Sequence, residues 1–83
     1  MTNGVKVIVM ARDGNVWEGE GDSCSMENKV GPFDILGEHA QMVAPIFGKI
    51  TVRRDNKIIW EHTLAESGLC KVKGNQVTVW VGI

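Results

Sequence analysis

Short runs in which apolar and polar residues alternate constrain this chain more than any other feature of its sequence. Val5, Val7 and Val9 alternate with Lys6 and Ile8, and similar runs recur along the 83 residues. Turn signals separate these runs roughly every ten residues, and no stretch of ten or more residues shows helical periodicity. Period-two alternation is typical of half-buried β-strands. We therefore expect one all-β domain over residues 1–83, folded as a sandwich or small barrel.

The composition agrees with a sheet and limits the kinds of partner. Val, Ile and Thr together number 22, whereas Leu and Ala together number 7. β-branched side chains suit a pleated sheet better than a helix. Nine Lys and Arg against ten Asp and Glu give a formal net charge of -1. This balance gives no electrostatic reason to expect nucleic acid or an anionic membrane as a partner, so we expect recognition by shape.

The alternation also locates the strands. Residues 46–53 and 58–64 flank a turn at 55–57 and form the clearest expected hairpin. A second hairpin opens the chain, with strands at 5–9 and 16–17, and residues 18–22 hold too many glycines and acids for a central strand. We expect a bulge or a loop at 18–22 and a turn at 37–38. The other expected strands are 24–26, 33–35, 69–72 and 76–81.

The sequence offers no recognisable catalytic, cofactor or metal site. It lacks a glycine-rich phosphate loop and a G-x-S-x-G motif. Cys24 and Cys70 have no second Cys or His at ligand spacing, which favours two buried free thiols in a reducing cytoplasm. His62 shares a strand face with apolar residues and is expected to be a packed or rim histidine. Asp34 and Glu38 are expected to be surface residues. We expect no enzyme activity and no cofactor.

Three tryptophans lie in three expected strands, namely Trp17, Trp60 and Trp80. They could form a core cluster or a stacking platform for bases, and core packing is the favoured interpretation. The alternative function that remains open is an independent small β-sandwich or OB-like module that binds nucleic acid or protein.

Four segments resemble the ε subunit of the F-type ATP synthase. Residues 31–40, GPFDILGEHA, resemble that family's G-x-x-G-I-x-P-G-H-A segment. Residues 66–72, ESGLCKV, are similar to its S-G-G-x-L-x-V, and residues 74–79, GNQVTV, to its closing P-G-N-V-T-V strand. Residues 16–19, VWEG, stand where the family has an apolar pair followed by x-G. The resemblance covers nearly the whole chain and keeps the order and spacing of these segments.

The resemblance implies the N-terminal domain of that family, a β-sandwich of two roughly five-stranded sheets. The implied function is that of a noncatalytic central-stalk subunit, which binds the γ subunit, rests on the membrane c-ring and couples the two during ion-driven ATP synthesis. It implies no direct insertion into the membrane, but a peripheral position on the cytoplasmic face of the cell membrane, and a cytoplasmic one before assembly. By motif position, Gly31, Pro32, Phe33 and Asp34 correspond to a ring-facing loop, and His39, Met42 and Ala44 to a segment toward γ.

The chain departs from the family pattern at three points. Gly37 and Glu38 replace a Pro-Gly turn, and Glu66 stands where the family has a small residue. The sequence ends at Ile83, whereas family members continue into a C-terminal helical hairpin that inhibits ATP hydrolysis and binds ATP. We expect that regulation to be absent if the sequence is complete. From the residues alone, Phe33 and Ile35 are expected to be ordinary core, because they alternate around Asp34.

Overall fold

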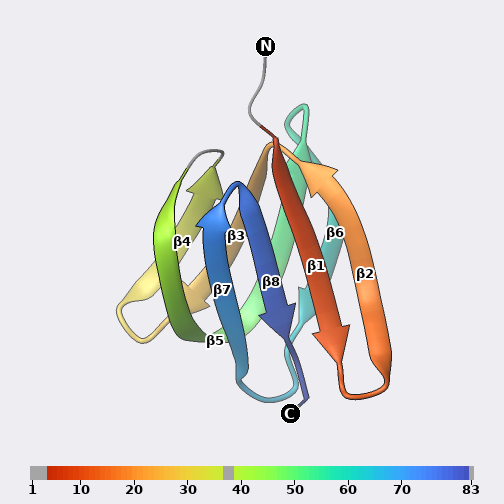
Figure 1. Cartoon of the computed structure of the whole chain (residues 1–83), viewed down its shortest axis with the longest axis vertical. Coiled ribbons are helices and arrows are strands. Elements are labelled where there is room, and N and C mark those ends of the chain that lie inside the picture. Colours follow the sequence, from red (N-terminus) through yellow and green to blue (C-terminus); the bar gives the residue numbers. More distant parts are fainter. Residues whose placement is uncertain (1–3, 37–38, 83) are drawn as a thin grey trace.

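The computed structural model describes residues 4–36 and 39–82, and the side chains of all of these except 39 and 40. Within those residues the chain forms eight β-strands and no helix (Figure 1). The expected all-β architecture is confirmed. The strands are β1 (Val5–Ala11), β2 (Gly14–Gly21), β3 (Ser23–Asn28), β4 (Gly31–Leu36), β5 (His39–Arg54), β6 (Lys57–Thr63), β7 (Gly68–Gly74) and β8 (Gln76–Trp80).

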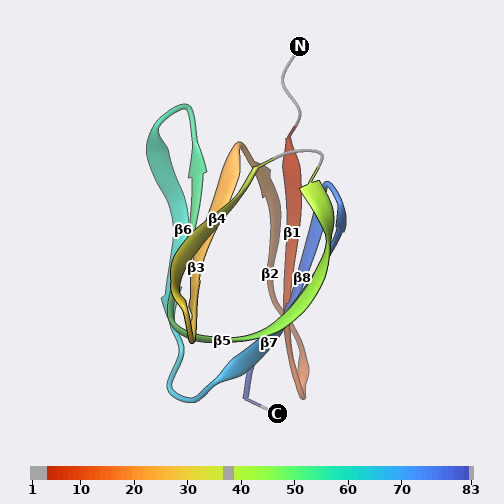
Figure 2. The same cartoon turned by 90° about the vertical axis from the view of Figure 1, so that its left-hand side faces the viewer.

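Strand β5 belongs to both layers of the sandwich. Its first half, residues 39–46, pairs with β7, and its second half pairs with β3 and β6. The first sheet therefore has the order β2-β1-β8-β7-β5, and the second has the order β6-β5-β3-β4. Figure 2 shows β5 curving from one layer into the other. Counting β5 in each, the sheets have five and four strands, close to the expected two roughly five-stranded sheets.

Gly48 lies where β5 leaves the first sheet for the second. Its φ is 71°, a left-handed conformation that favours glycine. A Cβ atom at this position would lie 2.8 Å from Oε1 of Glu27 on β3. Both observations explain why the strand bends at a glycine. The sequence predicted a strand over 46–53 but not that the same strand begins at His39 in the other sheet.

The strand pairing confirms the expected hairpins and adds a connection that alternation could not predict. β1 pairs with β2, β5 with β6 and β7 with β8, all antiparallel. Asp55 and Asn56 form the tight turn between β5 and β6, each with positive φ, as in hairpin turns of type I′. β1 and β8 pair in parallel, so the first and last strands lie side by side in the first sheet, although they are far apart in the sequence. The expected turn at 37–38 lies outside the described residues.

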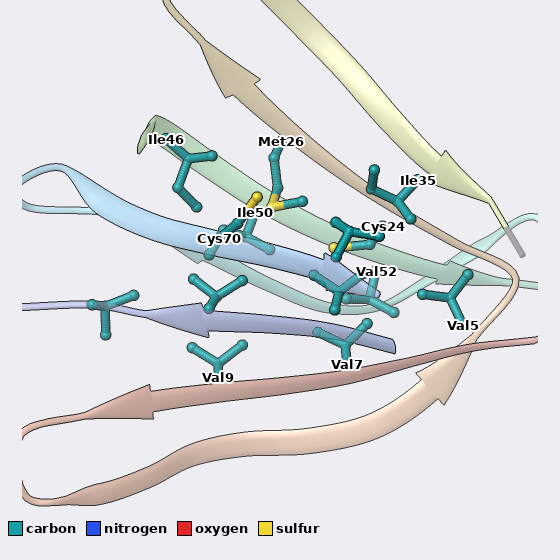
Figure 3. Close-up of a cluster of buried hydrophobic side chains, with 14 of the residues drawn as sticks. Val5, Val7, Val9, Cys24, Met26, Ile35, Ile46, Ile50, Val52 and Cys70 are labelled. Atoms are coloured by element: carbon teal, nitrogen blue, oxygen red, sulfur yellow. The ribbon is translucent and has the colours of Figure 1, made fainter. Parts of the chain in front are cut away.

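Fifteen buried apolar side chains fill the space between the sheets (Figure 3). They come from the inward positions of the alternating runs, as the sequence predicted, and include Val5, Val7 and Val9 of β1 and Ile46, Ile50 and Val52 of β5. Cys24 and Cys70 are both buried and both free, also as expected. The alternation in residues 46–53 places Thr51 on the outer face, yet it is only 6 % exposed. It lies between Ser25 and Glu61 in the middle of the second sheet, and its Oγ1 donates to Glu61.

Two local expectations are wrong. Residues 18–21 do not form a bulge or loop, because β2 runs through to Gly21 as an edge strand, where glycines and acids are tolerated; only Asp22 lies between β2 and β3. The irregularity in this hairpin lies instead opposite Val9 and Met10. Trp80 is not part of the core, because its neighbours Val79 and Val81 point inward and it lies on the outer face, beside Met10.

Candidate partner interface at one edge of the sandwich

The edge formed by β2 and β6, called here the closed edge, is covered by aromatic side chains. Trp17 of β2 stacks on Trp60 of β6, with ring centroids 4.9 Å apart and an interplanar angle of 8°. Trp60 also stacks with His62, at 5.6 Å and 6°. Both indoles pack against the core. The expected packing of His62 is confirmed, and the expected core packing holds for two of the three tryptophans.

Gly19 makes room for this stack. The Trp17 ring lies so close to Gly19 that a Cβ atom there would be 2.6 Å from two ring carbons. Gly19 and Trp17 point to the same face of β2, because they lie opposite Val7 and Val9 of β1. The glycine and the indole therefore act together, and the large ring covers what would otherwise be bare backbone. Because the rings stack on one another, they do not form a free platform for bases.

The edge formed by β4 and the first half of β5, called here the open edge, is finished differently. Phe33 of β4 and Met42 of β5 are half-buried and pack against the core from the two sheets. β7 pairs with one side of residues 39–46, and among the described residues no strand pairs with the other side. Figure 2 looks onto this edge, with β4 and β5 belonging to different layers. The open edge thus combines partly exposed apolar side chains with unpaired backbone.

The structure places the four residues matched to a ring-facing loop in a strand. Gly31, Pro32, Phe33 and Asp34 are the first four residues of β4, in register with Asn28 back to Ser25 on β3. The apex of this hairpin is formed by residues 29 and 30, which precede them. Residues 31–34 are therefore strand rather than loop, and Pro32 is accommodated because an edge strand tolerates a missing N–H.

The side chain of Asn28 holds the apex of the β3–β4 hairpin, and the apex exposes the apolar residue Val30. Oδ1 of Asn28 accepts hydrogen bonds from the backbone N–H groups of Val30, at 2.9 Å, and Gly31, at 3.2 Å. An Asx turn of this kind fixes the loop without help from the rest of the fold. Val30 is 96 % exposed at this apex. An apolar side chain held out by an ordered turn is suited to contact with a partner.

Asp34 belongs to a polar row on the outer face of the second sheet. Ser25 Oγ donates to Oδ1 of Asp34 at 2.6 Å, and Arg53 Nη1 donates to Ser25 Oγ at 3.0 Å. The three side chains lie on the adjacent strands β4, β3 and β5, with Asp34 and Arg53 exposed and Ser25 half-buried. Asp34 is therefore a surface residue, as expected, with partners within the domain. Glu38 lies outside the described residues.

The three residues matched to the segment toward γ lie in the first half of β5. Met42 and Ala44 face inward and are half-buried. His39 begins the strand and pairs with Gly74 in the backbone register, and its side chain is outside the described part of the molecule. The structure thus brings Phe33, Met42 and Ala44 to the two sides of one edge. Gly31 and His39 start strands that run in opposite directions along it, as Figure 1 shows.

Residues that the motifs did not indicate complete this surface. Val43 points outward on β5 and is 64 % exposed, beside Lys71 of β7. A shallow hollow of about 270 Å³ lies over β5 and β7, lined by Gln41, Met42, Val43, Lys71, Val72 and Lys73. The available signal was the run 41–47, which contains no charged residue. Its significance depends on its position at a sheet edge, which the sequence does not specify.

The buried thiols lie one strand in from the open edge. Cys24 on β3 is in register with Ile35 of β4, and Cys70 on β7 with Ala44 of β5. Burial raises the pKa of Cys24 to about 12, with a smaller contribution from the neighbouring Cys70. Burial also raises the pKa of Cys70, and a hydrogen bond from the Ala44 backbone opposes that shift. Such thiols remain protonated near neutral pH and are poor nucleophiles.

The described residues give no sign of a reaction centre. Within residues 4–36 and 39–82, no group of three or more His, Cys, Asp or Glu side chains is arranged to hold a metal ion. The same residues contain no helix long and apolar enough to cross a bilayer. The distinctive surface that the structure does offer is the open edge, which is suited to binding another protein.

Taken together, the fold and this edge define a small, two-layer β-sandwich domain with one closed edge and one open edge. Residues 4–82 match the family described as "ATP synthase, Delta/Epsilon chain, beta-sandwich domain". The chain belongs to this family, as the resemblance indicated. It is 29 % identical over 76 residues to the ATP synthase epsilon chain of Alkalihalophilus pseudofirmus, covering 90 % of this chain and 56 % of that protein.

Solved structures share the fold at low sequence identity. A chain of the Euglena gracilis mitochondrial ATP synthase, solved as OSCP, F1 and c-ring, matches 98 % of this chain with a TM-score of 0.83 and 13 % identity. A chain of the Tetrahymena thermophila mitochondrial ATP synthase central stalk and c-ring matches 95 % with a TM-score of 0.73 and 10 % identity. This chain covers 52 % and 63 % of those two chains, respectively.

Proposed function

We propose that this chain is a noncatalytic rotor-stalk subunit of an F-type ATP synthase, and that it couples the γ subunit to the c-ring. Family membership over residues 4–82 is the observation that carries the proposal. The relatives named above are an ATP synthase epsilon chain and chains of ATP synthase complexes that include the c-ring. The domain would act at the cytoplasmic face of the membrane, held there by the complex rather than by insertion.

The open edge is the proposed binding surface. In this proposal Met42, Ala44 and His39 of β5 face γ, and the hairpin that carries Gly31, Pro32, Phe33 and Asp34 faces the ring. The exposed Val30 at the apex of that hairpin and the half-buried Met42 support this assignment, because apolar surface left in water gains free energy when a partner buries it. Methionine also adapts its shape to a partner surface.

The test is to measure association of the chain with the γ subunit from the same source by calorimetry, using Met42→Asp as the disruptive variant. We expect a 1:1 complex that Met42→Asp weakens by at least about tenfold, since a carboxylate would have to be buried at the interface. Ala11→Asp is the matched control. Ala11 is also half-buried against the core, but it is the last residue of β1, at the β1–β2 turn, and does not belong to the open edge.

The two variants should lose comparable stability and differ in binding. If both variants weaken the affinity for γ equally, the loss of binding reflects only the lower stability of the domain, and the open edge is not the binding surface. If the folded wild-type chain does not bind γ at all, the stalk function itself is wrong. Salt-sensitive binding of the isolated chain to nucleic acid would then favour an independent binding module.

A further inference from the structure

The unpaired side of β5 differs from the other exposed strand edges in its lack of charge. Strand edges are usually protected by charged side chains, proline or a cover, because their free backbone groups pair readily with other strands. The other edge strands carry such charges: Glu18 and Glu20 in β2, Asp34 in β4, and Lys57 and Glu61 in β6. Residues 41–47 of β5 are QMVAPIF and carry none.

The backbone of this edge is positioned for pairing. Residues 42–46 are in register with residues 72–68 of β7 on one side, after a register irregularity between His39 and Met42, and the described residues provide no strand on the other. In a strand paired on one side, alternate N–H and C=O groups face outward. Pro45 has no N–H, which limits the available ladder to the residues before it. The side chain of Val43 is exposed in the middle of this stretch and borders the 270 Å³ hollow.

The charges beside the hollow indicate what could occupy the edge. Lys71 and Lys73 line it, and both are exposed. In the part of the chain that the structure describes, the ion pairs formed by lysines are Lys6 with Glu18 and Lys49 with Glu61, so these two lysines have no such pair. A second copy of the chain would bring lysines toward lysines. A segment with carboxylates would instead supply the missing charge.

We propose that residues 41–44 of β5 accept an extended segment of the partner protein as an added strand, and that this segment carries apolar side chains and at least one carboxylate facing Lys71 and Lys73. Main-chain hydrogen bonds would supply affinity, while contacts with Val43 and the two lysines would select the segment. This inference rests on the proposed function, since the partner used to test it is the γ subunit.

Hydrogen exchange separates strand addition from docking through side chains. The whole chain, labelled with ¹⁵N, is mixed with unlabelled γ subunit from the same source, and amide exchange is followed by NMR. We expect the outward-facing amides among residues 41–44 to slow by at least about tenfold, in an alternating pattern. Tight binding without that protection overturns strand addition and leaves the proposed function standing. Absence of binding by the folded chain overturns both.

Two substitutions at the exposed Val43 test the edge directly. Val43→Glu places a charge of the kind that protects natural edges and would repel a carboxylate of the segment, and we expect it to weaken association by about tenfold or more. Val43→Thr keeps a β-branched side chain, and we expect its affinity to stay within about twofold. Equal affinities for the two variants would contradict the proposal.

The charge requirement is tested by reversing the lysines. The double variant Lys71→Glu, Lys73→Glu should weaken association by about tenfold at low salt, with a smaller effect at high salt. Unchanged affinity would overturn the acidic character of the segment. If the free chain forms a dimer in which the outward-facing amides among residues 41–44 are protected, the occupant is a second copy, and the proposal of a partner segment is wrong.

Discussion

The two edges of this sandwich differ in how they end: side chains close one of them, and the other keeps partly exposed apolar side chains and unpaired backbone. At the closed edge, Trp17 and Trp60 stack across the gap between β2 and β6 and cover the core from that side. At the open edge, Phe33 and Met42 are half-buried and one side of β5 is unpaired. A sandwich needs its two layers held together, and one well-packed edge with a filled interior meets that need. The other edge is then available for a partner.

The comparison also separates stability from binding. Residues of the closed edge contact other residues of the same domain, so substituting them should lower the free energy of unfolding. Residues of the open edge have apolar surface that a partner would bury and backbone groups that it would pair, so substituting them should mainly lower the affinity for the partner. The predictions below test this division, beginning with the substitution expected to have the largest effect.

Removing the central ring of the stack should break the closed edge. Trp60→Ala deletes a large half-buried side chain and its contacts with Trp17 and His62. We expect the free energy of unfolding to fall by about 3 kcal/mol, the lower end for such a truncation because the ring is not fully buried. Urea unfolding at 25 °C measures the loss.

Trp80→Ala is the matched control for this prediction. Trp80 is also half-buried, but it lies on the outer face of the first sheet. We expect a clearly smaller loss of stability than for Trp60→Ala. Equal losses from the two variants would mean that the stack makes no special contribution at the closed edge, and the contrast between the two edges would fail.

Most of the fold could be predicted because each sheet has one buried face. Alternation in residues 5–9, 46–53 and 76–81 identified inward side chains correctly, since a shift by one residue would expose all of them. The turn at Asp55 and Asn56 was predictable from the same local chemistry. The parallel pairing of β1 with β8 and the passage of β5 between sheets were not, because both depend on contacts between distant segments.

Less of the candidate site could be predicted. The motifs located Met42 and Phe33, and the structure places both at the open edge. Residues 42–47 are an unbroken apolar stretch in the sequence, but nothing local distinguishes an edge strand from a buried one. Lys71 and Lys73 become relevant only because β7 pairs with β5. The role assigned to Gly31–Asp34 and to His39, Met42 and Ala44 in binding stays a prediction.

The thiols beneath the open edge should make stability depend on pH. The pKa of Cys24 is raised to about 12 in the folded chain, against 9.0 for an ordinary thiol. Above pH 9 the unfolded thiol loses its proton while the folded thiol keeps it, so the unfolded state binds fewer protons and stability falls as pH rises. We expect a loss of about 1.4 kcal/mol between pH 8 and pH 10 from this group.

Urea unfolding at the two pH values measures this loss, with Cys24→Ala as the comparison. The variant has a lower stability at pH 8 because of the cavity, but a weaker dependence on pH. Part of the dependence should remain, because the pKa of Cys70 is raised as well. An unchanged pH dependence in Cys24→Ala would show that the thiol is not sequestered in solution, and hence that the core beneath the open edge is accessible to water.

The turns next to the two edges give a finer comparison. At the open edge, Asn28 Oδ1 accepts hydrogen bonds from two backbone N–H groups, so Asn28→Ala should cost about 1 kcal/mol. At the start of β2, directly after the β1–β2 turn, Asn15 Nδ2 donates one exposed hydrogen bond of 3.3 Å to Glu18. Asn15→Ala should change stability by less than about 0.5 kcal/mol. Thermal unfolding of both variants tests the order, and a larger effect at Asn15 would contradict it.

The smallest expected effect concerns the lysines of the first sheet. Lys6 lies 3.7 Å from Glu18 of β2, and both side chains are about half exposed, whereas Lys71 beside β5 has no ion pair among the described residues. Lys6→Ala should therefore lower stability by at most about 0.5 kcal/mol at low salt, and by less when salt is added. Lys71→Ala should leave the stability of the free chain unchanged within error. If both lysines contribute equally to folding, Lys71 has an intramolecular role, and its availability to a partner at the open edge is disproved.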